Sequence, residues 1–290
     1  MANYYCMMAG LPDITLDSPM PVTFSAIREE MDMTLNDDDR ELIFYFFLEN
    51  DCKNLVRLLK NPDAEINPNC NYTMEQYRDM ITSAREMNFN VHRYPSFMSV
   101  FAREYNFNKD IKGWYAEDAM QYQFLQYAAQ CPNKMIREWY ELNLNINNVL
   151  TAMIARKEGW NVADFIQGDN DVTEMILNNN TKDFDLSLQY DYVKDLMQIV
   201  ECDDPVLKEK KIDAFKWAWL EERTFFDIFS IEAVFAYLCK MQMLDRWERL
   251  DPDKGRESFK QIIENLRSEA QVPEEFRMKS PYSKQCHFRC

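Results

Sequence analysis

Glycine is scarce in this chain, with five residues among 290. A dinucleotide-binding parallel sheet, a glycine-rich phosphate loop and a turn-dense β-sandwich all need positive φ angles or a close backbone approach, which glycine supplies. The scarcity argues against these three classes. It favours a chain built from helices, and 47% hydrophobic residues are enough to build a folded core.

Long apolar runs are also missing. The longest is Leu42–Leu48, far short of the roughly eighteen residues that cross a bilayer as a helix. Met1–Tyr5 offers no charged start followed by an apolar stretch, as a secretory signal would. We therefore expect no direct membrane span and a cytoplasmic protein, in which the eight scattered cysteines are small buried apolar residues.

Groups for catalysis are few. The chain has two histidines, and no glutamate precedes His92 by three residues as in di-iron bundles. The sequence contains no P-loop, no Gly-x-Ser-x-Gly nucleophile elbow and no His-Glu-x-x-His zinc motif. We expect no enzyme activity and no cofactor, and we interpret His92 as a surface or capping residue.

One group of metal-ligand types closes the chain: Cys286, His287 and Cys290. A closed zinc site needs a fourth ligand on a fixed backbone. Residues 271–290 carry no acidic residue from Arg277 onward but several basic ones, which is typical of a mobile basic tail. We expect such a tail and no metal, although the sequence leaves a metal site open.

Negative charge dominates, because 33 Lys and Arg stand against 49 Asp and Glu, a net charge of −16. A nucleic acid backbone would be repelled by such a chain unless its basic residues gathered on one face. Nucleic acid is therefore not an expected partner.

Apolar residues recur at helical spacing between clear breaks, which predicts an all-α, multi-lobed helical bundle. The N-terminal segment Asn3–Ala9 is expected to be short and extended or a single helical turn. Thr73 begins a helix with a capping-box partner at Gln76. The longest helix, Asn133–Glu158, is expected to be a buried spine that ends at Gly159. We expect lobes over residues 1–112 and 113–270, with the boundary near Lys112.

Four asparagines lie in this spine, at Asn143, Asn145, Asn147 and Asn148. Asparagine has a low helix propensity, and it is unfavourable inside a helix unless its side-chain amide forms hydrogen bonds. Two or more of them face solvent in one interpretation. In the other, Asn148 bonds a neighbouring helix and fixes register.

A second dense segment, Trp217–Asp227, mixes aromatic and charged residues. Aromatic residues are enriched at interfaces but are more often found in cores. Core packing with a charged rim and a partner surface both remain open.

A resemblance to a known family rests on three segments, Asn3–Asp13, Asn143–Lys157 and Lys216–Phe226, and it extends to about Ala270. The chain resembles an uncharacterised bacterial family whose members are similar to the C subunit of V/A-type ATP synthases. In that C subunit, a stalk protein, an asparagine is typically followed by a basic pair and then a glycine. This chain has the same order in Asn148, Arg156-Lys157 and Gly159. Asn145 stands where the stalk protein commonly has an acid, and Ile154 where it has an arginine.

The resemblance implies a funnel-like, all-helical adaptor without chemistry of its own. It would link the rotating central stalk to the membrane proteolipid ring in proton- or sodium-coupled transport, at the inner face of the cell membrane. The partners would be the other central-stalk subunits and the ring. The candidate contact residues are Asn145, Asn148, Arg156, Trp217, Trp219, Glu221, Glu222, Arg223, Phe225 and Phe226.

Two other classes remain open. The chain could serve as a free-standing acidic helical protein-interaction module, or as a helical enzyme that binds a small molecule or a metal. Co-purified rotor subunits would favour the adaptor, a different protein partner would favour the module, and a tightly bound ligand would favour the enzyme.

Overall fold

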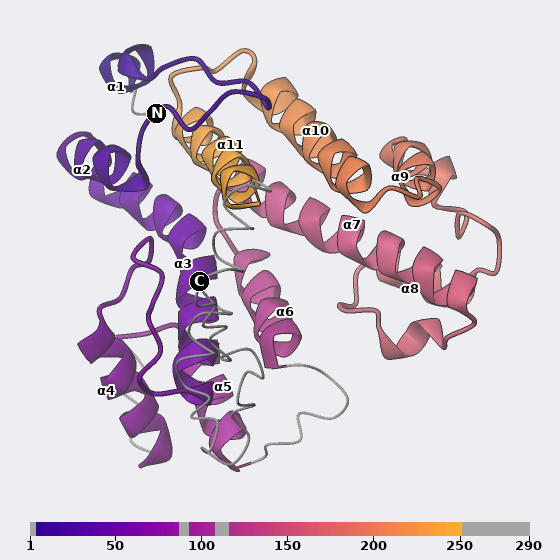
Figure 1. Ribbon diagram of the computed structural model, residues 1–290, viewed down its shortest axis with the longest axis horizontal. Coiled ribbons are helices and arrows are strands. Elements are labelled where there is room, and N and C mark those ends of the chain that lie inside the picture. The colour runs from indigo at the N-terminus through magenta and orange to yellow at the C-terminus, as the bar shows by residue number, and fades with distance from the viewer. Residues whose placement is uncertain (1–3, 87–92, 108–115, 251–290) are drawn as a thin grey trace, which may run out of the picture. The chain divides into compact units, whose positions relative to one another are not determined.

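The fold is all-α, as the periodicity predicts. A computed structural model describes residues 4–86, 93–107 and 116–250, and in these residues it contains eleven α-helices, two short 3-10 helices and no strand (Figure 1). None of the helices in these ranges combines the length and apolar character that a bilayer span requires. The helices are α1 (Tyr5–Gly10), α2 (Phe24–Thr34), α3 (Asp37–Lys60), α4 (Met74–Arg85), α5 (Ser96–Phe107), α6 (Ala116–Ala128), α7 (Lys134–Glu158), α8 (Asp171–Asn178), α9 (Tyr192–Val200), α10 (Pro205–Thr224) and α11 (Ile231–Arg249).

The predicted spine is confirmed as α7, which ends at the predicted Gly159 and begins with an Asn133 cap. The Asn133 side chain accepts a hydrogen bond from the Ile136 N–H at 3.1 Å, which satisfies a free donor of the first turn. Gly159 lies at φ 72° and its N–H bonds back to the last turn. A residue with a β-carbon disfavours that left-handed conformation, so glycine ends the helix there.

The capping box predicted for α4 is also present. Thr73 Oγ1 accepts from the Gln76 N–H at 3.3 Å, and Gln76 Oε1 accepts from the Thr73 N–H at 2.8 Å. α3 begins in a related way, because the Asn36 side chain accepts from Asp39 N–H. Each of these bonds joins residues that are three apart in the chain, so the start of each helix can be predicted from local sequence alone.

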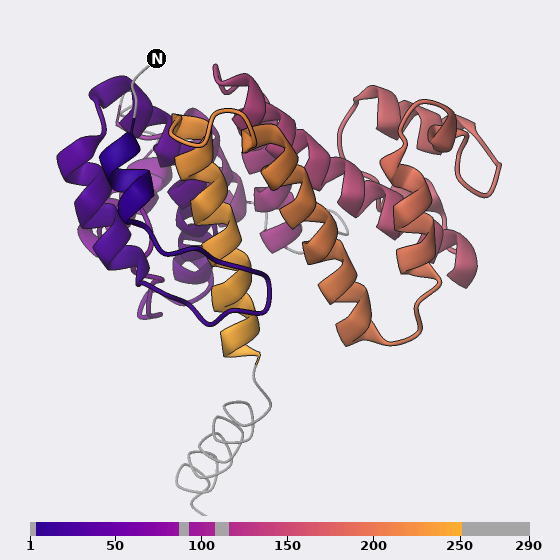
Figure 2. The ribbon, with the colours of Figure 1, turned by 90° about the horizontal axis from the view of Figure 1, so that it is seen from above.

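Two structures were possible for the N-terminal segment, extended or helical. The helical one is present, as α1. The Tyr4 N–H donates to the Phe229 carbonyl at 2.8 Å, which holds α1 beside the turn that precedes α11. Residues 11–22 then run without regular structure across α11 (Figure 2), where Tyr237 Oη donates to the Pro12 carbonyl at 3.0 Å.

A first apolar core is shared by α2 to α6, the first half of α7, the end of α10 and α11. Its most buried members include Leu48, Tyr77, Met98, Phe124 and Phe235. The boundary expected near Lys112 lies outside the described residues. The helices on either side of it, α5 and α6, both contribute to this one core.

A second core forms on the remaining part of α7, with α8, α9 and the first half of α10 around it. Ile146 and Val149 of α7 are completely buried in it, whereas Leu150 is half-buried. The spine is therefore buried along most of its length, but Leu150 lies at the margin of its apolar stripe.

Residues up to Leu244 form one compact unit, and a second begins at Asp245. Its described part is the last turn of α11 and Leu250, and here Arg249 Nη2 pairs with Asp245 Oδ2 at 2.9 Å. The helix expected over Arg256–Ala270 and the tail over 271–290 lie outside the described residues.

Candidate partner-binding surface

Helix α10 begins with a strong local signal. The Asp204 side chain accepts from the Val206 and Leu207 N–H groups at 2.8 and 3.3 Å, and Pro205 occupies the first turn. Proline is tolerated there because the first N–H groups of a helix have no partner inside it. The helix then places Trp217 and Leu220 in the first core.

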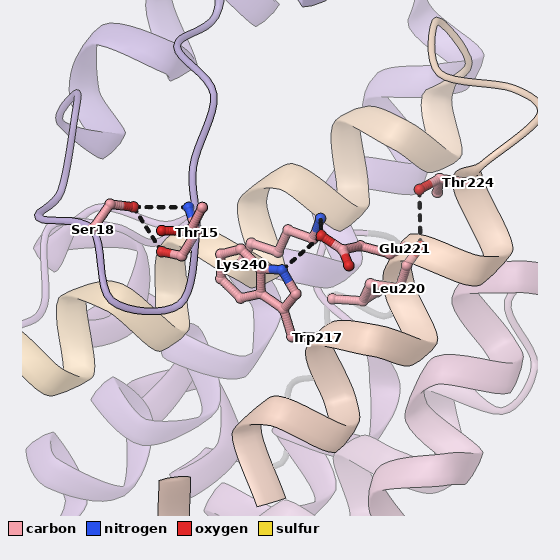
Figure 3. A network of polar contacts seen from close by, with 7 residues as sticks. All are labelled: Thr15, Ser18, Trp217, Leu220, Glu221, Thr224 and Lys240. Atoms are coloured by element: carbon pink, nitrogen blue, oxygen red, sulfur yellow. Dashed lines mark hydrogen bonds and ion pairs between the residues drawn. The ribbon is translucent and has the colours of Figure 1, made fainter. Parts of the chain in front are cut away.

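Trp217 anchors a polar triad on the surface of α10 and α11 (Figure 3). Its Nε1 donates to Glu221 Oε1 at 2.8 Å, and Lys240 Nζ lies 3.2 Å from the same oxygen. The Lys240 ammonium also lies 4.8 Å from the centre of the Trp217 ring. The cation thus gains from both the carboxylate and the ring face, which holds α10 against α11.

Trp219 and Arg223 form a second pair that faces α7. The Arg223 guanidinium lies 5.2 Å from the Trp219 ring centre and its Nη1 lies 3.4 Å from Glu138 Oε2. Trp219 in turn lies 5.8 Å from the Trp139 ring. Both residues therefore support the packing of α10 on α7, with Arg223 still exposed.

The turn between α10 and α11 exposes large apolar side chains. Phe225 is 70% exposed, Phe226 91% and Ile228 53%. The two phenylalanine rings meet edge to face, with centres 5.0 Å apart. Tyr5 of α1 is 58% exposed and its ring lies 4.7 Å from that of Phe229. We call Tyr5, Phe225, Phe226 and Ile228 the aromatic turn.

The backbone under the aromatic turn is held at both sides. Thr224 Oγ1 donates to the Leu220 carbonyl at 2.8 Å, which closes the end of α10 (Figure 3). Ser230 Oγ donates to the Asp227 carbonyl at 2.8 Å and accepts from the Ala233 N–H at the start of α11. The exposed rings are thus presented on a fixed turn, which would lower the ordering cost if a partner bound there.

A pocket of about 290 Å³ lies beside this turn, between residues 8–14, the end of α10 and α11. Its walls include Leu11, Ile14 and Ile228, and its charged members are Asp13, Glu221 and Lys240. Ile228 therefore belongs to both the pocket and the aromatic turn.

The other predicted contact residues, on α7, bind the chain's own loops. Asn148 Nδ2 donates to the Gln167 carbonyl at 2.6 Å and its Oδ1 accepts from the Gln167 N–H at 3.1 Å. Asn145 Oδ1 accepts from Asn170 Nδ2 at 2.8 Å. Asn148 thus fixes the loop before α8 instead of a helix, while Asn147 faces solvent.

Arg156 has a similar internal role. Its guanidinium donates to the Thr181 and Asn179 carbonyls and lies 3.7 Å from the centre of the Phe184 ring. Partial burial lowers the pKa of Arg156. Phe184 has φ 58°, an unusual conformation for a residue with a β-carbon, so Arg156 covers a strained loop.

Sequence reasoning missed a buried carboxylate, Asp51 of α3. It accepts hydrogen bonds from the N–H groups of Asn71 and Tyr72, from Asn71 Nδ2 and from Tyr77 Oη. Burial raises the pKa of Asp51, against the opposing effect of these donors. The available signal was an aspartate inside the apolar helix α3, which is followed by a loop rich in Asn and Pro. Asp51 holds the backbone of that loop.

No three metal-ligand side chains come together among the described residues. Both histidines and the Cys286, His287 and Cys290 group lie outside those residues.

These features define an all-α protein with an exposed aromatic turn on a fixed backbone. The chain belongs to the family described as Protein of unknown function (DUF2764), whose family model matches residues 1–270. No curated protein and no solved structure matches the chain.

Proposed function

We propose that this chain is a non-catalytic subunit of a V/A-type ATP synthase, similar to the C subunit of its central stalk. It would link the rotating stalk to the membrane proteolipid ring at the inner face of the membrane. The observation that carries a binding role is the aromatic turn, where Phe225 and Phe226 are largely exposed side by side. Aromatic groups of this kind are the usual anchors of protein interfaces.

An adaptor between two partners needs two surfaces, and the chain offers a second exposed aromatic pair. Trp160 and Phe165, just beyond α7, are 55% and 44% exposed, with ring centres 5.6 Å apart. They lie by the second core, whereas the aromatic turn lies by the first. Two separate aromatic surfaces favour an adaptor over a protein with a single binding site.

The test is co-expression of the tagged full-length chain with the stalk and ring subunits of the V/A-type ATP synthase from its own organism. The proposal expects these subunits to be recovered with the chain in stoichiometric amounts. An unrelated soluble protein carrying the same tag controls for carry-over. Failure to recover any stalk or ring subunit would rule out the adaptor role.

A free-standing acidic helical interaction module is the second candidate. Its support is the net charge of −16 together with the same aromatic turn, which would suit a basic partner outside any rotary complex. Recovery of a different stoichiometric partner, with no rotor subunit, would favour this candidate.

A further inference from the structure

The pocket beside the aromatic turn has the size and lining for one long side chain. At about 290 Å³ it lies at the lower limit of small-molecule sites, which are about 300 to 1,000 Å³. Leu11, Ile14 and Ala236 provide apolar walls. Such walls suit the hydrocarbon stem of a lysine or an arginine, whose charged end needs a polar partner.

Four titratable groups line this pocket: Asp13, Glu221, Tyr237 and Lys240. Lys240 is already engaged by Glu221 and the Trp217 ring, and the Tyr237 hydroxyl donates to Pro12. Asp13 makes no ion pair with any described residue and is exposed. Two carboxylates against one ammonium leave the pocket with a net negative charge, so it favours a cation.

Negative charge continues around the aromatic turn. Glu222 and Asp227 flank Phe225 and Phe226 in the sequence, and both are exposed without an ion pair to any described residue. The aromatic turn and the pocket meet at Ile228. A partner that contacts Ile228 therefore touches both the aromatic turn and the pocket.

The geometry points to a binding site for a polypeptide segment that presents a lysine or arginine next to an apolar side chain. The basic side chain enters the pocket toward Asp13 and Glu221, and the apolar side chain packs on Phe225 and Phe226. This inference rests on the proposed function in taking the ligand to be a protein, and it specifies the chemistry of that partner.

Two synthetic helical peptides of equal length test the recognition on the full-length chain. Each carries a Leu-Phe pair on one face, next to Arg in the first peptide and Gln in the second. The inference expects the Arg peptide to bind at least about tenfold more tightly, because only it can pair with the carboxylates. Equal affinity for the two peptides would overturn it, and this comparison needs no variant of the protein.

A charge swap then locates the site. Asp13→Lys should weaken binding of the Arg peptide about tenfold or more, whereas Asp17→Lys should leave it unchanged. Asp17 is a matched control because it is exposed in the same segment but does not line the pocket. Equal effects of the two variants, with unchanged melting temperatures, would place recognition elsewhere and overturn the inference.

Recovery of stalk and ring subunits separates this inference from the proposed function. Rotor subunits that bind the wild type and Asp13→Lys equally well would leave the function standing and reject the pocket as their contact. A chain that binds the Arg peptide at Asp13 but recovers no rotor subunit would keep the site and reject the adaptor role.

Discussion

At the residue scale, asparagine side chains act as clamps between long helices and the loops that follow them. Asn148 bonds both backbone groups of Gln167, and Asn54 of α3 does the same to Asn67 at 3.0 and 2.8 Å. The side-chain amide has an NH₂ donor group and a carbonyl acceptor, so it can bond both the backbone N–H and the backbone C=O of one residue. This is why asparagines that lower helix propensity are tolerated in α3 and α7.

Asn148→Ala should lower the free energy of unfolding by about 1 to 3 kcal/mol, because it leaves the half-buried Gln167 N–H without its partner and the Gln167 carbonyl with only the 3.4 Å bond from Thr173 Oγ1. Asn147→Ala is the matched control one position away. Its exposed side chain should be replaceable without loss, with a gain of about 0.5 kcal/mol from helix propensity. Urea unfolding measures both variants, and equal values would contradict the clamp.

Glu49 of α3 gives a pH-dependent prediction. Burial acts to raise its pKa, but Lys53, whose Nζ lies 2.7 Å from Oε1, helps to lower the pKa below the ordinary 4.5. A depressed folded-state pKa contributes stability above the unfolded value, and that stability is lost as the pH falls through the folded value.

The wild type should therefore exceed Glu49→Gln in free energy of unfolding above pH 4.5, and its advantage should shrink as the pH falls further. Unfolding curves of both proteins at several pH values give this difference directly. An advantage that grows toward low pH would mean that burial dominates and that the pKa is raised instead.

At the element scale, the ends of α7 and the capping box of α4 could be predicted because they depend on neighbours in the sequence. The residues at the end of α10 could not be assigned to core or surface in this way. Helical spacing could not decide between core and surface for Trp217–Asp227, and both interpretations hold for different residues: Trp217 is buried, and Phe226 lies beyond the last turn in solvent.

The partners of the α7 side chains could not be predicted for a different reason. Asn148 and Arg156 bond to loops 19 to 25 residues away, and sequence spacing does not say which loop packs on a helix. Asp13 and Lys240, which line the same pocket, are likewise separated by most of the chain. Only the folded structure brings such residues together.

Ile146→Ala in α7 should cost about 2 to 5 kcal/mol of unfolding free energy, because the side chain is fully buried in the second core. Leu150→Ala should cost clearly less, since Leu150 is half-buried one turn further on. Chemical denaturation of the two variants tests the assignment of the buried stripe. A larger loss for Leu150 would place that stripe on another face of α7.

Gly159→Ala should cost about 1 kcal/mol, because alanine disfavours the left-handed conformation at φ 72°. No atom lies within 4 Å of the added β-carbon, so the cost is conformational and not a clash. Gly10→Ala is the control, with equally open space and no positive φ. Thermal melts should separate the two, and an unchanged melting temperature for Gly159→Ala would contradict the capping role.

At the scale of the whole molecule, the two cores provide stability, and we assign binding to the aromatic turn. Phe225→Ala with Phe226→Ala should change the free energy of unfolding by about 0.5 kcal/mol or less, because both rings are largely exposed. Leu188→Ala is a matched control, an 84% exposed apolar residue beside the second core. A large loss of stability in the double variant would instead make the rings part of the fold.

We propose that the aromatic turn is one of the two surfaces that dock the chain onto the stalk and ring of a rotary ATP synthase. The most direct measurement is the dissociation constant of the full-length chain for the purified stalk and ring subcomplex. We predict that Phe225→Ala with Phe226→Ala weakens binding at least about tenfold, a loss of roughly 1.4 kcal/mol, while Leu188→Ala binds like the wild type. Equal affinity of the wild type and the double variant would contradict the claim.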